Sequence, residues 1–209
     1  MPNFRKVTNE DFLKNDPLRE FHVWWDDISD QEVTELETIL ESADREEQLQ
    51  QVLTRIPVLL VQNMKGGHGR WVIPKKKLGS EYVTDFVIGE RHSFGFDWVA
   101  VELESPKSRM FTKKGNPTKQ LTHAIRQIQD WRAWLKRNQD YAARELVKGG
   151  LGLTDIDSNI QGMILIGRRN ADDSTDELRR QMIQDLKIKI HSYDTLVEWC
   201  RSRARYRRK

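Results

Sequence analysis

The strongest constraint on the fold is a short stretch in which apolar and acidic side chains alternate. It reads Val99-Ala-Val-Glu-Leu-Glu-Ser-Pro106. Apolar residues at every second position indicate a strand with one apolar face. Because side chains along a strand repeat their direction every two residues, Glu102 and Glu104 are predicted to point to the same side.

A lone acid lies on the candidate strand that precedes this stretch. Asp85 is separated from Glu102 by sixteen residues and has β-branched and aromatic neighbours within residues 82–88. If the two strands pair as a hairpin, the three carboxylates converge. Carboxylates that lie close together raise one another's pKa unless a cation lies between them, and a hard divalent ion takes oxygen ligands. Alternatively, Glu102 and Glu104 form the solvated face of an amphipathic strand.

Length and composition limit the class of protein. The 209 residues suit one ordinary domain, and seven tryptophans argue against disorder. We expect residues 1–29 to form an arm packed on a domain of residues 30–209. The sequence has no run of about eighteen apolar residues, so no membrane span is expected. The first residues lack the apolar run of a secretory signal, and the single Cys200 fits a reducing cytoplasm.

The net charge of +3 conceals an uneven distribution. Residues 201–209 hold six basic residues and no acid, whereas the remainder has 29 lysines and arginines against 32 acids. This tail is either a phosphate-binding arm or only a solvated end. Further basic residues lie on both sides of the acidic strands, namely Lys65, Arg70, Lys75, Lys76, Lys77, Lys107, Arg109, Lys113, Lys114 and Lys119.

Periodicity and turn residues predict alternating helices and strands. Helices are expected from Asp30 onward and after Asp44, and at 118–137, 139–148, 175–186 and 194–203. Strands are expected at about 71–74, 82–88, 96–104, 161–167 and 188–191. The Trp24-Trp25 pair is interpreted as docked on the core. The order is an α/β fold, an αβββαβ core with a mixed central sheet flanked by helices, plus a C-terminal strand and helices.

The motifs in this order resemble those of a nuclease family. The chain carries Glu46 in its first core helix, then Asp85-Phe86, Glu102-Leu-Glu-Ser-Pro106, Phe111-Thr-Lys113, Gly115-Asn-Pro117 and the span from His123 to Trp131. An αβββαβ core with these acids resembles the PD-(D/E)xK superfamily, which has the restriction-endonuclease-like fold. The whole succession, over roughly residues 40–200, resembles the Shedu anti-phage defence nucleases.

The resemblance implies roles for particular residues. Asp85 and Glu102 match the acids that bind the metal, which would be Mg²⁺ with Mn²⁺ as a possible substitute, and the carbonyl of Leu103 would complete the coordination. Gln127 matches a glutamine beside the catalytic acids, and Glu46, or the adjacent Glu47, matches the acid of the first helix.

One residue departs from the family pattern. The usual motif is E-x-K, whereas this chain has Glu104 at the position of the lysine. Glu104 could act as a base or bind a second metal. Alternatively, Lys107, Lys113 or Lys114 supplies the cation, or the site is degenerate and only binds DNA.

Together with the clustered acids, this resemblance implies a Mg²⁺-dependent endodeoxyribonuclease of bacterial anti-phage defence that hydrolyses phosphodiester bonds. DNA is the expected partner, and a homo-oligomer, either a dimer or a tetramer, is expected. The DNA-binding residues are predicted to be Lys75, Lys76, Lys107, Lys114, Arg203 and Arg205. The competing classes are a non-catalytic nucleic-acid-binding or regulatory protein on the same fold, and an unrelated structural domain whose acids are surface groups.

Overall fold

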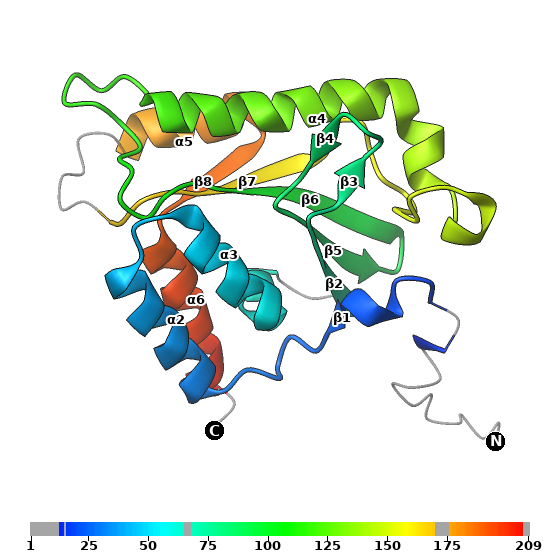
Figure 1. Ribbon diagram of the computed structural model, residues 1–209, viewed down its shortest axis with the longest axis horizontal. Coiled ribbons are helices and arrows are strands. Elements are labelled where there is room, and N and C mark those ends of the chain that lie inside the picture. Colours follow the sequence, from blue (N-terminus) through cyan, green and yellow to red (C-terminus); the bar gives the residue numbers. More distant parts are fainter. Residues whose placement is uncertain (1–12, 15, 65–67, 170–175, 207–209) are drawn as a thin grey trace.

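A computed structural model describes residues 13–14, 16–64, 68–169 and 176–206. Its centre is a six-stranded mixed sheet with the strand order β1-β2-β5-β6-β7-β8 (Figure 1). The pairs from β1 to β6 are antiparallel, and β6, β7 and β8 run parallel. The strands are β1 (His22–Val23), β2 (Gly69–Pro74), β5 (Phe86–His92), β6 (Gly95–Leu103), β7 (Gln161–Leu165) and β8 (Ile188–His191).

Helices cover both faces of this sheet (Figure 1). One face packs against α2 (Asp30–Ser42), α3 (Glu46–Arg55), the 3₁₀ helix η2 (Pro57–Val61) and α6 (Tyr193–Tyr206). The other face packs against α4 (Lys119–Ala143) and α5 (Asp176–Leu186). The expected αβββαβ core is confirmed as α3-β2-β5-β6-α4-β7, with β8 and α6 among the C-terminal additions.

Local side-chain chemistry fixes where the helices begin. Ser29 accepts a hydrogen bond from the Glu32 amide, and the Glu32 carboxylate accepts one from the Ser29 amide in return. This reciprocal pair satisfies amides that an α-helix leaves without intrahelical partners, so α2 starts at Asp30 as expected. At α3 the side chain of Gln48 accepts from the amides of Asp44 and Arg45.

Arg132 fastens α4 to the ends of the parallel strands. Its guanidinium donates to the carbonyls of Ile160, Leu186 and Lys187, at 2.9, 2.7 and 3.0 Å. These carbonyls lie just before β7 and β8. A single planar guanidinium with fixed donor directions therefore fixes where both strands begin relative to α4.

Three expectations about the elements were wrong. The strand expected at 82–88 is divided into β4 (Tyr82–Val83), which pairs with β3 (Lys77–Leu78), and β5. The helix expected at 139–148 is instead the end of α4, which bends at Asn138 and is followed by η3 (Leu146–Lys148). Residues 19–23, assigned to an irregular arm, form η1 (Arg19–Phe21) and β1. The helix expected at 194–203 is confirmed as α6, which continues to Tyr206 and so includes the first part of the basic segment 201–209.

The tryptophan pair docks on the body of the protein, as expected. Trp25 is partly buried against the core on the α2 side of the sheet. The Arg203 guanidinium lies 4.2 Å from the centre of its ring, so the end of α6 contacts the segment that precedes α2. Trp24 packs edge-on against His22. Across the part of the chain that the structure describes, no helix is both long and apolar enough to cross a membrane.

Candidate functional site

The register of the sheet aligns Asp85 with Glu102. The last paired residues of β5 and β6 are Phe86 and Val101, so the next position on each strand brings Asp85 opposite Glu102. On the other side of β5, Pro74 pairs with Phe86, and the next residue is Lys75, whose amide donates to the Asp85 carbonyl at 2.8 Å. Lys75, Asp85 and Glu102 therefore form a row across three strand ends.

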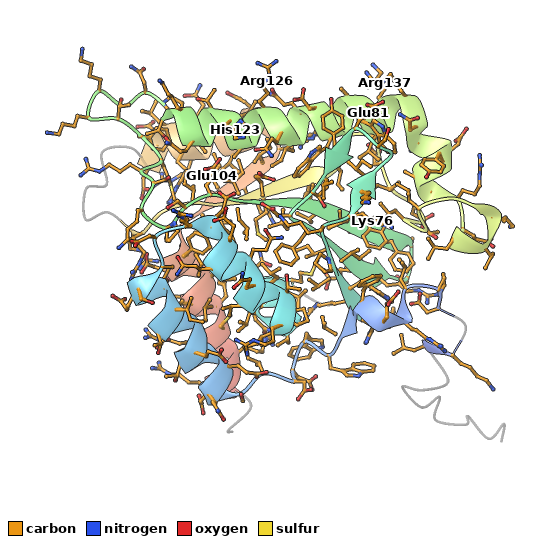
Figure 2. All side chains as sticks on the ribbon, in the orientation of Figure 1. Lys76, Glu81, Glu104, His123, Arg126 and Arg137 are labelled. Carbon is orange, nitrogen blue, oxygen red and sulfur yellow. The ribbon has the colours of Figure 1, made fainter. Side chains whose placement is uncertain are left out.

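The acids of this row lie on the face of the sheet that α4 covers. Val87 and Ala100, two positions away from Asp85 and Glu102, pack in the same apolar cluster as Ile128 of α4. Because side chains alternate along a strand, Asp85, Glu102 and Glu104 share that face. In Figure 2, Glu104 lies between α3 and α4.

Both oxygens of Asp85 have partners. Its Oδ2 accepts the Leu103 amide at 2.8 Å, and its Oδ1 accepts the Lys75 ammonium at 2.7 Å. The Leu103 amide takes this acceptor because Thr84, its neighbour in the register, has turned away from β6. The Thr84 amide donates instead to the Lys76 carbonyl, next to the small β3–β4 sheet. Since the amide and carbonyl of a strand residue point to the same side, the Leu103 carbonyl is also directed toward Asp85.

The acidic site, which we define as Glu46, Asp85, Glu102 and Glu104, is poorly compensated in charge. Asp85, Glu102 and Glu104 are 9%, 6% and 7% exposed. Burial, and then the charges of Asp85, Glu104 and Glu46, raise the pKa of Glu102 to about 9. Burial, and then Glu46 and Asp85, raise the pKa of Glu104 to about 7. Within the described ranges, neither glutamate carboxylate makes a hydrogen bond or an ion pair. These are buried acids without a full counter-charge.

Two helices complete the surroundings of these acids. Glu46 begins α3, and burial followed by the charges of Asp85 and Glu47 raises its pKa. Gln50, one turn later on the same helix face, directs its amide toward the Asp85 carbonyl at 3.5 Å. The fully buried Tyr193, at the start of α6, donates its hydroxyl to the Glu104 carbonyl at 2.9 Å.

Other residues singled out in the sequence lie apart from the acids or engage different partners. Gln127 has a buried side-chain oxygen for which the described residues supply no donor, and it makes no hydrogen bond to the acidic site. Lys107 lies 3.6 Å from Asp44. Lys113 and Lys114 are exposed on the loop before α4.

Of the remaining residues predicted to contact DNA, some already have partners within the protein and one is exposed. Lys76 is partly buried and donates to the Leu151 carbonyl at 2.7 Å, and burial lowers its pKa. Arg203 stacks on Trp25, whereas Arg205 is exposed on α6. Lys65 and residues 207–209 lie outside the described residues.

The loop of residues 105–117 is attached to the sheet at its beginning. Gly167, just beyond β7, donates its amide to the Ser105 carbonyl and accepts the Tyr193 amide. It has a φ of +66°, and a Cβ atom there would lie 2.1 Å from the Ser108 carbonyl oxygen. A glycine is therefore required where this loop, β7 and α6 meet.

Sequence reasoning missed the position of Lys75 and the part played by Gln50. Lys75 was assigned to DNA binding with its neighbours, yet it is the lysine that contacts Asp85. The signal available was weak: Lys75 follows a strand that ends in proline, and its pairing with Asp85 appears only once the register of β2 and β5 is known.

The fold and the site together define a mixed α/β protein with buried carboxylates at adjoining strand ends. A family model described as Shedu protein SduA, C-terminal, matches residues 43–197, and the chain belongs to this family. The matched span runs from just before α3 into α6 and includes all four acids. No curated protein matches the chain.

The raised pKa of Glu102 predicts a pH-dependent stability. The pKa of Glu102 in the folded chain lies above the ordinary value of 4.5. The contribution of this carboxyl to the free energy of unfolding is therefore fully present below about pH 4.5. It is lost as the pH rises toward 9. Glu102→Gln should therefore raise the free energy of unfolding at pH 8 by about 1–3 kcal/mol, and by much less at pH 4.5.

Urea unfolding at pH 4.5, 6, 7 and 8 measures this difference. Glu177→Gln, at an exposed position of α5, is the matched control and should leave the pH profile unchanged. A Glu102→Gln variant that follows the parent chain across this range would contradict a buried, uncompensated carboxyl.

Proposed function

We propose that this chain is a metal-dependent endodeoxyribonuclease of the PD-(D/E)xK type that serves bacterial anti-phage defence. Membership of the Shedu family supports the defence role. The observation that carries the chemistry is the juxtaposition of Asp85, Glu102 and Glu104, each less than a tenth exposed, at the ends of two paired strands. Buried carboxylates so close together lower the folding stability, and such groups are found mostly at functional sites, where a ligand compensates their charge.

The donor set suits Mg²⁺ or Mn²⁺. Carboxylate and carbonyl oxygens are the ligands that hard divalent cations take, and Asp85, Glu102 and the Leu103 carbonyl would hold the ion. The raised pKa values of Glu102 and Glu104 indicate the missing positive charge. Among the described residues, no group of three or more acidic, histidine or cysteine side chains already has the arrangement of metal ligands.

The protein residues would divide the work of hydrolysis. A bound divalent ion would lower the pKa of the attacking water and polarise the scissile phosphate. Glu104, on the same strand face as Glu102, would accept the proton of that water. Glu46 faces the same charges from α3, and Lys113 and Gln127 stay predicted contributors. DNA binding through Lys107, Lys114 and Arg205 remains part of the proposal, as does a homo-oligomer.

One observation favours the competing function. The acidic site lacks the lysine of the usual motif, and the lysine that reaches it occupies a metal-ligand oxygen of Asp85. A degenerate site of this kind would bind nucleic acid without cleaving it. Cleavage assays separate the two functions directly.

Asp85→Asn should abolish metal-dependent nicking of plasmid DNA, lowering the rate by about 100-fold or more. Asparagine retains an oxygen for the Leu103 amide, so the variant should keep the fold, whereas alanine would leave that amide without an acceptor. Gel assays with Mg²⁺, Mn²⁺ and chelator measure the effect, and Asp140→Asn, on an exposed part of α4, is the control. A parent chain that binds DNA and never nicks it would establish the competing function.

Glu104→Gln tests the residue that departs from the family pattern. If this carboxylate accepts the proton, turnover should fall by 10²-fold or more while DNA affinity stays nearly constant, because only a transition-state interaction is lost. Single-turnover nicking and fluorescence anisotropy with labelled DNA give the two values. Full activity in this variant would show that Glu104 has no chemical role and would favour Lys113 as the residue that supplies the missing cation.

The exposed lysines of the loop predict a salt dependence. If Lys113 and Lys114 each neutralise one phosphate, changing both to glutamine should reduce the slope of log affinity against log salt by about 1.8, at about 0.9 for each contact. Lys189→Gln, exposed on β8, should change neither the slope nor the affinity. Anisotropy titrations from 50 to 300 mM salt decide the matter, and an unaltered slope would make this loop a solvated segment.

A further inference from the structure

Lys75 is held beside the acidic site by an unusual backbone conformation. Its φ is +47°, a value that residues with a side chain seldom adopt. The hydrogen bond from its amide to the Asp85 carbonyl, one step beyond the paired part of β2 and β5, maintains this conformation. The backbone therefore places a cationic residue directly opposite Asp85.

The Lys75 side chain reaches the acids from the solvent. Its side chain is 58% exposed, and its ammonium lies 2.7 Å from Asp85 Oδ1. Its charge also opposes the rise in the pKa of Glu102 and of Glu46. Among the described residues, no other lysine, arginine or histidine forms an ion pair with the acidic site. A side chain so exposed can leave Asp85 without losing core packing.

The two oxygens of Asp85 are not equivalent. The Leu103 amide fixes Oδ2, which leaves Oδ1 as the oxygen that can change partners. Beside it, Glu102 is more than nine-tenths buried and has no ion pair or hydrogen bond of its own within the described ranges. A divalent cation that binds Glu102 and Asp85 Oδ1 would meet the Lys75 ammonium at the same place, and like charges at that distance repel.

We infer that Lys75 is an exchangeable counterion, a positioning residue that occupies Asp85 in the free protein and transfers to a DNA phosphate when a divalent cation binds. This inference rests on the proposed function, since the cation and the phosphate belong to that reaction. The exchange makes metal binding and DNA binding mutually favourable. The cation displaces the Lys75 ammonium from Asp85, and the DNA phosphate gives that ammonium a new partner. No bond is made or broken in the exchange.

Calcium titrations test the exchange without cleavage. Ca²⁺ takes carboxylate oxygens, and isothermal titration calorimetry measures its affinity. Lys75→Met should bind Ca²⁺ about tenfold more tightly than the parent chain in the absence of DNA, because the competing charge is gone. Lys75→Arg, which keeps the charge, should resemble the parent. Lys77→Met, two residues along at an exposed position, is the control for charge alone.

The same titrations with a short DNA duplex complete the cycle. The duplex should tighten Ca²⁺ binding to the parent chain by a larger factor than to Lys75→Met. The inference is overturned if the duplex tightens Ca²⁺ binding by the same factor in both chains, or if Lys75→Met binds Ca²⁺ no more tightly than the parent chain. It is also overturned if Lys77→Met gains as much Ca²⁺ affinity as Lys75→Met, or if neither the parent chain nor Lys75→Met binds Ca²⁺ at millimolar concentration. Thermal melting confirms that the variants are folded before they are compared.

The outcome is separable from that of the proposed function. If Lys75→Met tightens Ca²⁺ binding and reduces the coupling to DNA while the parent chain never nicks plasmid, hydrolysis fails and the counterion role stands. If the parent chain nicks plasmid and the Ca²⁺ affinities are equal, the nuclease stands and the exchange fails.

Discussion

The geometry of the acidic site depends on one hydrogen bond, from the Leu103 amide to the Asp85 carboxylate. The end of β6 would normally find its next backbone partner on the adjoining strand. Thr84 has turned away to the β3–β4 sheet, so a buried amide is left to be satisfied by a side chain. The carboxylate that satisfies it is thereby held beside Glu102. The hydrogen bond between the Leu103 amide and Asp85 Oδ2 therefore both satisfies the end of β6 and fixes the position of an acid in the site.

The charges around this bond are unequal. Four acids meet at the strand ends and the start of α3, and the described residues offer them a single ammonium group. Burial and mutual repulsion keep Glu102 and Glu104 easy to protonate near neutral pH. This imbalance lowers the folding stability at neutral pH, because buried carboxylates without a full counter-charge are disfavoured in their ionised form. The same imbalance supports the proposed function, in which a divalent cation would supply the missing positive charge.

Much of the fold could be predicted from local signals. The helical periodicity from Asp30 onward located α2, the alternation around Glu102 located β6, and β8 was predicted at its observed limits. The errors occurred where tertiary contacts override local pattern. The strand through Asp85 is divided because Thr84 pairs with Lys76, and two-residue β1 exists only through its pairing with β2. The sequence also predicted that Asp85 and Glu102 approach each other. The place of Lys75 depended on a register between distant strands and on a positive φ, neither of which has a local sequence signal.

The glycine at the end of β7 has a consequence for how this protein can vary. Because Gly167 contacts the loop backbone at Ser105 and leaves no room for a side chain beside Ser108, the first residues of that loop cannot be re-routed independently of the sheet. Farther along, the loop closes on itself through short-range hydrogen bonds between Thr112, Gly115 and Asn116. Insertions and exchanges are therefore tolerable in the distal half of the loop, where Lys113 and Lys114 lie. If the loop contacts DNA as proposed, changes at this tip would alter that contact and leave the acidic site at the strand ends unchanged.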